Sequence, residues 1–244
     1  MRAAVAATVT GAEVADRVAG ELAARADPAQ AEPMAAYMRD QFPFLGVKAP
    51  AQARAWTAAT AGLPRRLPED VVVAAALDLW GRPEREHQYL ACRLVNRHAA
   101  APRTPAVPPS SAFLDVVERL VVTRSWWDTV DALATHATGD LVRRYPDLRP
   151  RMDTWLAGED LWLVRSSLLH MNRWGAARDA DWLFAACLAR ADHPDFFVRK
   201  AIGWALREHS KLDGPAVASF VAAHAGELSG LSSREALAWL DRRR

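Results

Sequence analysis

The segment SWWDTVD, residues 125 to 131, combines two tryptophans with two carboxylates at helical spacing. Trp127 and Asp131 are four residues apart, so in a helix the indole and the carboxylate lie side by side on one face. Both groups attract a cation, the indole through its π-face and the carboxylate through its charge. The pair therefore suggests a site that holds a cationic group.

The same segment also has a purely structural interpretation. Ser125 and Asp128 have the spacing of a capping box, which predicts that a helix begins here with Ser125 as its cap and that Asp128 has a structural role. The tryptophans would then fill a helical core, while Asp131 caps, pairs with an arginine or faces water. Spacing does not decide between the two interpretations.

Two further residues stand out in apolar surroundings. Arg165 lies in the segment LWLVRSSLL and needs an acidic or phosphate partner, which in the structural interpretation is an Asp of a neighbouring helix. Trp204 follows Gly203, whose missing side chain would let a neighbouring backbone approach or leave the indole uncovered. The basic residues near these positions are Arg173, Arg199, Lys200 and Arg207. A solvated surface is the ordinary role of such arginines.

Other catalytic chemistry lacks its usual signatures. The sequence contains no G-x-S-x-G, no Gly-rich phosphate loop and no HExxH. His136 is five residues beyond Asp131, so it does not share the helix face of that carboxylate and is a weak candidate for a general base. Cys92 and Cys187 are far apart and belong to no C-x-x-C motif, which argues against a disulfide framework and a zinc site. We expect neither a metal nor a cofactor.

Composition favours helices and a cytosolic protein. The 244 residues are 51% hydrophobic with only 12 glycines, and Ala, Leu and Arg dominate the long segments. The 31 Lys and Arg against 29 Asp and Glu give a net charge of +2, so a nucleic-acid partner would require basic residues gathered on one face by the fold. No apolar run reaches membrane-spanning length, and acidic residues interrupt the Ala-rich start, which predicts no membrane segment and no secretory signal.

Apolar spacing predicts helices throughout the chain and no strands. The expected helices are 11–26, a short one ending near 40, one beginning at 50, then 69–80, 84–98, 112–123, 125–144, 149–156, 160–174, 178–191, 195–209, 214–227 and 232–242. Residues 42–47, FPFLGV, form an apolar, proline-bent turn of the kind that usually fills a core. Residues 101–111, APRTPAVPPSS, are predicted to form a loop within one domain that spans 1–244.

A faint internal repeat supports a stacked arrangement. Residues 162–168 match residues 196–202 at an offset of 34, and each segment follows an acidic residue, Asp160 or Asp195. Helical pairs that repeat at such intervals stack into an α-solenoid with a concave surface. A curved tube of this kind suits a long, rod-like partner.

Four blocks together resemble a known family. In order along the chain they are YMRDQFPFLGVKAP, SWWDTVD, LWLVRSSLL and FFVRKAIGWALRE. Their order and spacing are similar, over about residues 10–240, to the bacterial DNA alkylation-repair glycosylases built from HEAT-like repeats, the AlkD type. The resemblance implies an all-α, right-handed α-solenoid of HEAT-like repeats whose concave face binds duplex DNA.

The resemblance also implies roles for single residues. The family's catalytic carboxylate falls on Asp131, its two cradle tryptophans on Trp127 and Trp204, and the arginine that contacts the DNA backbone at the lesion on Arg165. Tyr37 falls on an aromatic position beside the lesion. Further DNA contacts are expected at Arg173 and Arg207, with Arg199 and Lys200 adding positive charge close by.

The implied activity is removal of N3- and N7-alkylated purines from duplex DNA without drawing the base into a pocket, as part of base excision repair. The protein would act as a monomer in the bacterial cytosol or nucleoid. Alternatives are a glycosylase specialised for bulky alkyl adducts, a non-catalytic binder of damaged or bent DNA, and a HEAT-type scaffold for a peptide. The residues at positions 127, 131, 165 and 204 favour the enzyme.

Overall fold

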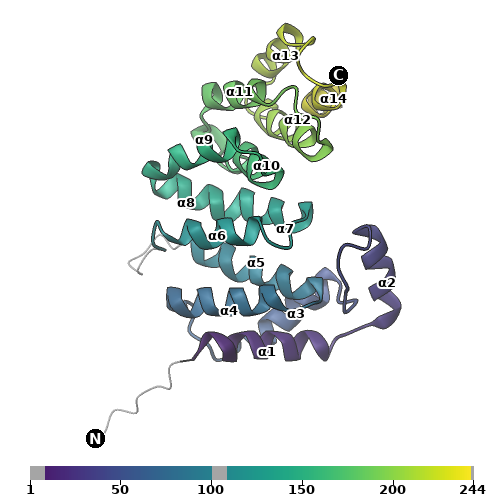
Figure 1. The fold of residues 1–244 in the computed structure, drawn as a ribbon, viewed down its shortest axis with the longest axis vertical. Coiled ribbons are helices and arrows are strands. Elements are labelled where there is room, and N and C mark those ends of the chain that lie inside the picture. Colours follow the sequence, from purple (N-terminus) through teal and green to yellow (C-terminus); the bar gives the residue numbers. More distant parts are fainter. Residues whose placement is uncertain (1–8, 101–108, 243–244) are drawn as a thin grey trace, which may run out of the picture. The chain divides into compact units, whose positions relative to one another are not determined.

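The computed structural model describes residues 9–100 and 109–242, and every regular element in these ranges is a helix (Figure 1). The all-α prediction is confirmed. The chain divides into two compact units, residues 1–98 and 99–244. That the whole chain acts as one domain remains a prediction, and residues 101–108 of the proline-rich segment lie outside the described ranges.

The first unit contains five helices within its described residues. They are α1 (Gly11–Ala23), α2 (Pro28–Tyr37), α3 (Ala49–Ala59), α4 (Glu69–Gly81) and α5 (Arg85–Ala99). Helix α1 packs against α3 and α4 through Val14, Val18 and Leu22, which recur at helical spacing and are buried. A capping box between Thr10 and Glu13 fixes its beginning.

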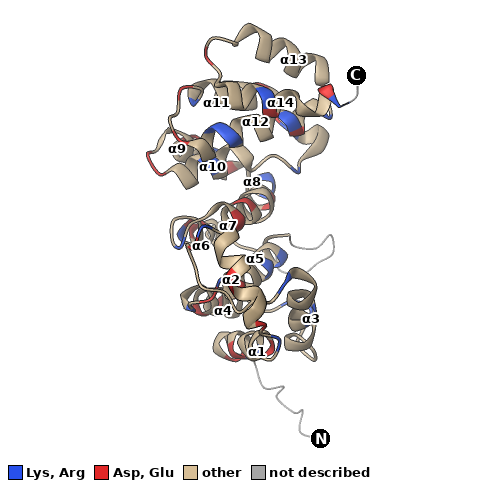
Figure 2. Ribbon diagram, turned by 90° about the vertical axis from the view of Figure 1, so that its right-hand side faces the viewer, with Lys and Arg blue, Asp and Glu red and all other residues tan. Residues whose placement is uncertain are grey.

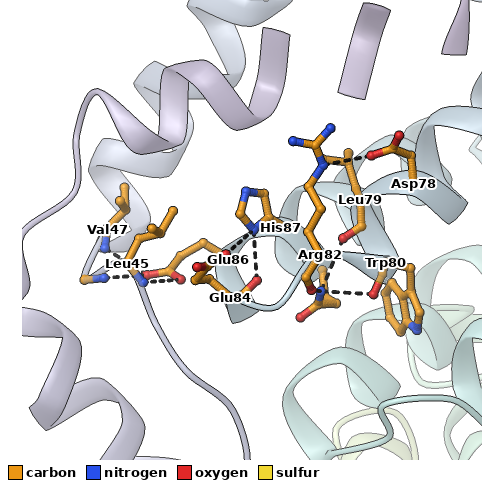
Figure 3. Close-up of polar contacts among 11 residues, drawn as sticks. Leu45, Val47, Asp78, Leu79, Trp80, Arg82, Glu84, Glu86 and His87 are labelled. Atoms are coloured by element: carbon orange, nitrogen blue, oxygen red, sulfur yellow. Dashed lines mark hydrogen bonds and ion pairs between the residues drawn. The ribbon is translucent and has the colours of Figure 1, made fainter. Parts of the chain in front are cut away.

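The apolar turn before α3 is held by one buried carboxylate. Phe44 and Val47 are buried, as expected for residues that fill a core. The Glu86 side chain on α5 accepts backbone N–H bonds from Leu45 at 3.0 Å and from Gly46 and Val47 at 2.9 Å (Figure 3). Glu86 therefore satisfies three backbone N–H donors of a turn that belongs to no helix.

The second unit holds the segments with candidate chemistry. Its α-helices are α6 (Phe113–Val121), α7 (Trp127–Ala132), α8 (Gly139–Arg144), α9 (Arg149–Ala157), α10 (Leu161–Leu169), α11 (Ala180–Ala189), α12 (Phe196–Ser210), α13 (Gly214–Ala223) and α14 (Gly230–Asp241). Helix α10 packs on α7, α9 and α12, and α12 packs on α14, beside which it lies in Figure 1. The stacking thus brings α7, α10 and α12 together.

The repeat that the sequence indicated has a structural counterpart. Asp160 is the N-cap of α10 and accepts from the backbone N–H groups of Trp162 and Leu163. Asp195 is the N-cap of α12 and accepts from Phe197. The matching acidic residues therefore begin two equivalent, neighbouring helices.

The capping box predicted at the beginning of the central helix is wrong. Ser125 and Asp128 form no capping box: the Ser125 hydroxyl donates to the Val121 carbonyl at 2.6 Å, and Asp128 accepts from the adjacent Thr129 N–H. Trp126 occupies the N-cap without a side-chain capping bond. The hydroxyl instead satisfies a carbonyl in the last turn of α6, an equally local partner.

The expected continuous helix 125–144 is interrupted by a π-helix, η1 (Leu133–Thr138), between α7 and α8. A π-helix makes i→i+5 hydrogen bonds and inserts an extra residue per turn, which apolar spacing does not reveal. The expected helix 160–174 also ends early, at Leu169. The buried Arg178 guanidinium satisfies the carbonyls of Met171 and Asn172 beyond that end.

Within residues 9–100 and 109–242, no helix combines the length and apolar character that crossing a membrane requires.

Replacing Glu86 by Gln tests the anchor of the apolar turn. The amide keeps one acceptor oxygen where the carboxylate has two, so at least one buried N–H loses its partner. We expect the free energy of unfolding to fall by about 1–3 kcal/mol. Urea denaturation measures it, with Glu32→Gln, an exposed glutamate in the same unit, as the control. Equal free energies of unfolding for the two variants would contradict the role of Glu86 as the anchor of the turn.

Candidate active site

A cavity of about 340 Å³ lies in the second unit at the junction of α7, α10 and α12. Its walls are formed by Trp127, Asp131, Arg165, Phe196, Phe197, Lys200, Trp204 and Arg207. The four residues singled out for chemistry, at positions 127, 131, 165 and 204, are therefore brought to one place from three helices. Lys200 and Arg207, expected DNA contacts, join them.

The centre of the cavity is a two-point ion pair between α7 and α10. Arg165 Nε donates to Asp131 Oδ1 at 2.7 Å, and Arg165 Nη2 donates to Asp131 Oδ2 at 2.8 Å. Parallel N–H···O bonds of this kind fix the orientation of both groups. The sequence suggested, as a structural role for Arg165, an ion pair with an Asp of a neighbouring helix, and this contact is such a pair. Its partner is Asp131, the candidate catalytic residue.

The pair is unequally buried. The Arg165 side chain is 4% exposed, whereas Asp131 keeps 18% of its surface open. Burial raises the pKa of Asp131 above its ordinary value, and the hydrogen bonds and charge of Arg165 offset this only in part. The carboxylate is thus the open end of the pair, and Arg165 is its inner support.

Arg165 is held from a third side by α12. Its Nη1 donates to the backbone carbonyl of Phe197, and its guanidinium lies 6.0 Å from the centre of the Phe197 ring. Behind it, the rings of Trp126, Trp162 and Phe197 form a cluster with centroid separations of 5.0 to 5.9 Å. These rings come from the N-terminal ends of α7, α10 and α12, so the cluster fixes the three helices around the ion pair.

Helix α12 contributes a continuous stripe to the cavity. Phe196, Lys200, Trp204 and Arg207 follow one another at spacings of four, four and three, which places them on one helix face. The Trp204 indole N–H donates to Glu208 at 3.3 Å. Gly203 meets the expectation of close approach, since a Cβ there would lie 2.8 Å from the Ser232 carbonyl oxygen of α14.

Several sequence-predicted residues lie outside this cavity. Tyr37 is exposed at the end of α2 in the first unit and lines a separate hollow with Met34, Phe44 and Tyr89, so its place beside a lesion remains a prediction. Arg173 is exposed on the turn after α10. Arg199 has a buried Nε without a hydrogen-bond partner among the described residues.

His136 lies on the π-helix and not in the cavity lining. Burial lowers its pKa, and the charge of Arg173 lowers it further. No group of three or more His, Cys, Asp or Glu suited to a metal ion occurs among residues 9–100 and 109–242.

Sequence reasoning missed Phe196, Phe197 and Glu235. Phe196 shares the four-residue spacing of Lys200 and Trp204, a signal that was present but unused. Phe197 contributes mainly through its backbone carbonyl, which no side-chain pattern reveals. Glu235 on α14 forms ion pairs with Lys200 and Arg207, and only the packing of α14 on α12 discloses it.

This arrangement is suited to a cation that develops or arrives beside Asp131. A carboxylate with one open side lies in a cavity whose walls also carry two indoles and two phenylalanine rings. The aromatic surface keeps water away from the carboxylate, which strengthens its attraction to a positive centre. The cations Lys200 and Arg207 at the α12 wall suit anionic groups attached to such a ligand.

Comparisons with known proteins indicate the family to which the chain is similar. Residues 18–240 match the model of a family described as DNA alkylation repair enzyme. A solved structure from Enterococcus faecalis, described as a predicted DNA alkylation repair enzyme, is 27% identical, with a TM-score of 0.75. The likeness covers 88% of this chain and 97% of the other and is consistent with the helical-repeat solenoid expected from the sequence. No curated protein matches the sequence.

Arg165→Gln tests the support of Asp131. It leaves a largely buried carboxylate without its cation, and we expect a loss of about 3 kcal/mol, the lower end of the range because Asp131 is partly exposed. Burial already raises the pKa of Asp131, so ionisation of this carboxyl opposes folding as the pH rises through its folded pKa. Loss of Arg165 makes ionisation of Asp131 still more unfavourable to folding.

The difference between Arg165→Gln and wild type should therefore be largest at neutral pH and shrink in mild acid, where a protonated Asp131 needs no cation. Urea denaturation at both pH values measures it. The double variant with Asp131→Asn serves as control, since it carries no charge at either position. A destabilisation that does not change with pH would refute the role of the charge.

Proposed function

Because this chain belongs to the family of DNA alkylation repair enzymes, we propose that it is a monofunctional DNA glycosylase of the AlkD type. It hydrolyses the N-glycosidic bond of cationic N3- or N7-alkylated purines in duplex DNA. The observation that carries the proposal is the Asp131 carboxylate, held from within by Arg165 and open towards a cavity that Trp127 and Trp204 share.

The chemistry of the lesion explains why so few groups suffice. An N3- or N7-alkylated purine already carries a positive charge. When the C1′–N bond breaks, its electron pair returns to the purine, which departs as a neutral base without protonation by a general acid. Positive charge then resides on the deoxyribose as an oxocarbenium-like centre, and the protein has to stabilise that centre and admit water.

Asp131 supplies the negative charge for this step. Each carboxylate oxygen accepts one hydrogen bond from Arg165 and retains a further lone pair. The open side of Asp131 faces the sugar and accepts a hydrogen bond from the incoming water. Because Arg165 fixes both oxygens, the carboxylate does not have to reorient as charge develops.

The two indoles add a second source of stabilisation. Trp127 comes from α7 and Trp204 from α12, and their π-faces attract the cationic sugar in addition to the carboxylate. Fixed dipoles and quadrupoles of this kind replace water around the developing charge.

The basic residues have two different roles in this proposal. Lys200 and Arg207 on the α12 wall bind phosphates of the DNA backbone, which sets register and carries no sequence information. Arg165 is buried and engaged with Asp131, so its principal role is to position the carboxylate. A direct contact of Arg165 with the backbone at the lesion, which the family resemblance implies, stays a prediction, as do DNA contacts of Tyr37, Arg173 and Arg199.

In this proposal the base is not drawn into a pocket, in contrast to base-flipping glycosylases. The cavity recognises sugar and phosphate, so the size of the alkyl group does not limit binding. The protein acts on duplex DNA as a monomer in the bacterial cytosol or nucleoid and requires no cofactor.

Asp131→Asn is the decisive test of the carboxylate. We expect release of N7-methylguanine and N3-methyladenine from methylated duplex DNA to fall by roughly 10²–10³-fold, the size of losing one preorganised charge-stabilising group. Affinity for the duplex should change little. Chromatography of the released bases and a binding titration measure the two quantities.

Asp128→Asn is the matched control, because it removes a neighbouring carboxylate that does not line the cavity. Equal rates for Asp131→Asn and wild type would refute the mechanism. If wild type releases no methylated base but binds damaged DNA, a role in binding alone or a preference for bulky adducts would replace the proposal.

Substitutions of Trp204 test the π-face. Trp204→Phe keeps an aromatic surface and should lose only a few-fold in rate, whereas Trp204→Leu removes a cation–π contact of about 0.5–2 kcal/mol. We therefore expect Leu to be slower than Phe in single-turnover release of N7-methylguanine. Similar rates for the two variants would show that the indole acts by shape alone.

A further inference from the structure

Glu235 is a partly buried carboxylate with no role in the mechanism above, yet it contacts two residues of the cavity wall. It lies on α14 and forms ion pairs with Lys200 and with Arg207 of α12, the latter at 2.6 Å. Lys200 and Arg207 flank Trp204 on the same helix face. One carboxylate thus bridges the two cations on either side of a cradle tryptophan.

The exposure of the three side chains shows which of them can bind a further group. Glu235 is 19% exposed, whereas Lys200 is 38% and Arg207 26% exposed. The carboxylate therefore lies deeper than the cations it holds. Lys carries three N–H donors and Arg five, so both retain donors after pairing with Glu235. Figure 2 shows the two signs of charge together on α12 and α14.

The packing of α14 on α12 leaves Glu235 little freedom. A Cβ at Gly203 would lie 2.4 Å from the Cβ of Glu235, so the two helices meet at this residue more closely than any side chain at 203 would allow. The Ser232 hydroxyl, one turn earlier on α14, donates to the Arg199 carbonyl at 2.9 Å. The base of the Glu235 side chain is therefore fixed against the backbone of α12.

We propose that Glu235 is a positioning residue that holds Lys200 and Arg207 on either side of Trp204, so that the two cations form a ready clamp for a phosphate next to the reacting sugar. The inference rests on the proposed function and assigns its DNA-backbone contact to a built pair of cations. Without Glu235 the two like charges repel each other and lose their common anchor. The net charge of the wall becomes more positive, which favours DNA binding in general, but the phosphate is no longer placed relative to Asp131.

Intact DNA binding together with slower base release would separate a positioning role of Glu235 from a merely structural one. Glu235→Gln should bind undamaged duplex DNA at least as tightly as wild type, because one negative charge is removed. At saturating DNA, its single-turnover release of N7-methylguanine should fall by about tenfold or more, since a displacement near 1 Å costs up to 10² in rate. A duplex that carries a cationic pyrrolidine in place of the lesion sugar imitates the charged sugar, so wild type should bind it more tightly than undamaged duplex. Glu235→Gln should lose this preference.

The matched control is Glu227→Gln, which removes one exposed carboxylate of the same unit, paired with His224 and remote in sequence from α12. It should keep both the rate and the preference for the pyrrolidine duplex. Glu235→Asp, which retains the charge on a shorter side chain, should restore part of both.

Two results for Glu235→Gln would overturn the inference. The first is a wild-type rate of base release together with a wild-type preference for the pyrrolidine duplex. The second is a parallel fall in melting temperature, rate of base release and affinity for every DNA, because that pattern marks a structural role. If wild type itself neither releases base nor prefers the pyrrolidine duplex, the proposed function fails and the clamp fails with it.

If Glu235→Gln does not fold, the variant Lys200→Gln with Arg207→Gln tests the same clamp. The dependence of log K on log salt should then lose about 0.9 for each phosphate contact removed. An unchanged salt dependence overturns the inference.

Discussion

The bidentate ion pair between Asp131 and Arg165 is the constraint on which the second unit depends. It joins α7 to α10, and the same guanidinium reaches the Phe197 carbonyl of α12, so one side chain ties three helices. Burying such a pair is costly unless its remaining donors are satisfied. The Phe197 carbonyl accepts one of those remaining donors, and the aromatic cluster packs beside the guanidinium. The open side of Asp131 is what remains for chemistry.

Polar links between successive repeats recur at nearly constant separation. Asp131 and Arg165 are 34 residues apart, Lys200 and Glu235 are 35 apart, and Arg190 donates to a carbonyl 34 residues earlier. Repeat proteins rely on contacts between neighbouring units because no single helical pair buries its own apolar face. The candidate site is therefore built from the ordinary inter-repeat contacts of the fold, with one of them left partly open.

The sequence predicted the helices through their periodic apolar spacing, whereas the central residues of the cavity were predicted by local patterns together with the resemblance to a known family. Trp127 and Asp131 share a face through a four-residue spacing, and the apolar neighbours of Arg165 indicated that its guanidinium needs an acidic partner. The Phe197 carbonyl and Glu235 left no such signal, since their contacts arise from helix packing. The supposed capping box at Ser125 failed because a nearby carbonyl of α6 competed for the hydroxyl.

The π-helix that follows Asp131 separates two requirements on one helical segment. Trp127 and Asp131 must face the cavity, while Leu141 and Val142 further on must face the core, and both are fully buried. In an uninterrupted α-helix a fixed angle of about 100° per residue would link the two orientations. The wider turn of Leu133–Thr138 breaks this link. Substitutions in α7, which faces the cavity, and in α8, which faces the core, are consequently constrained independently of each other.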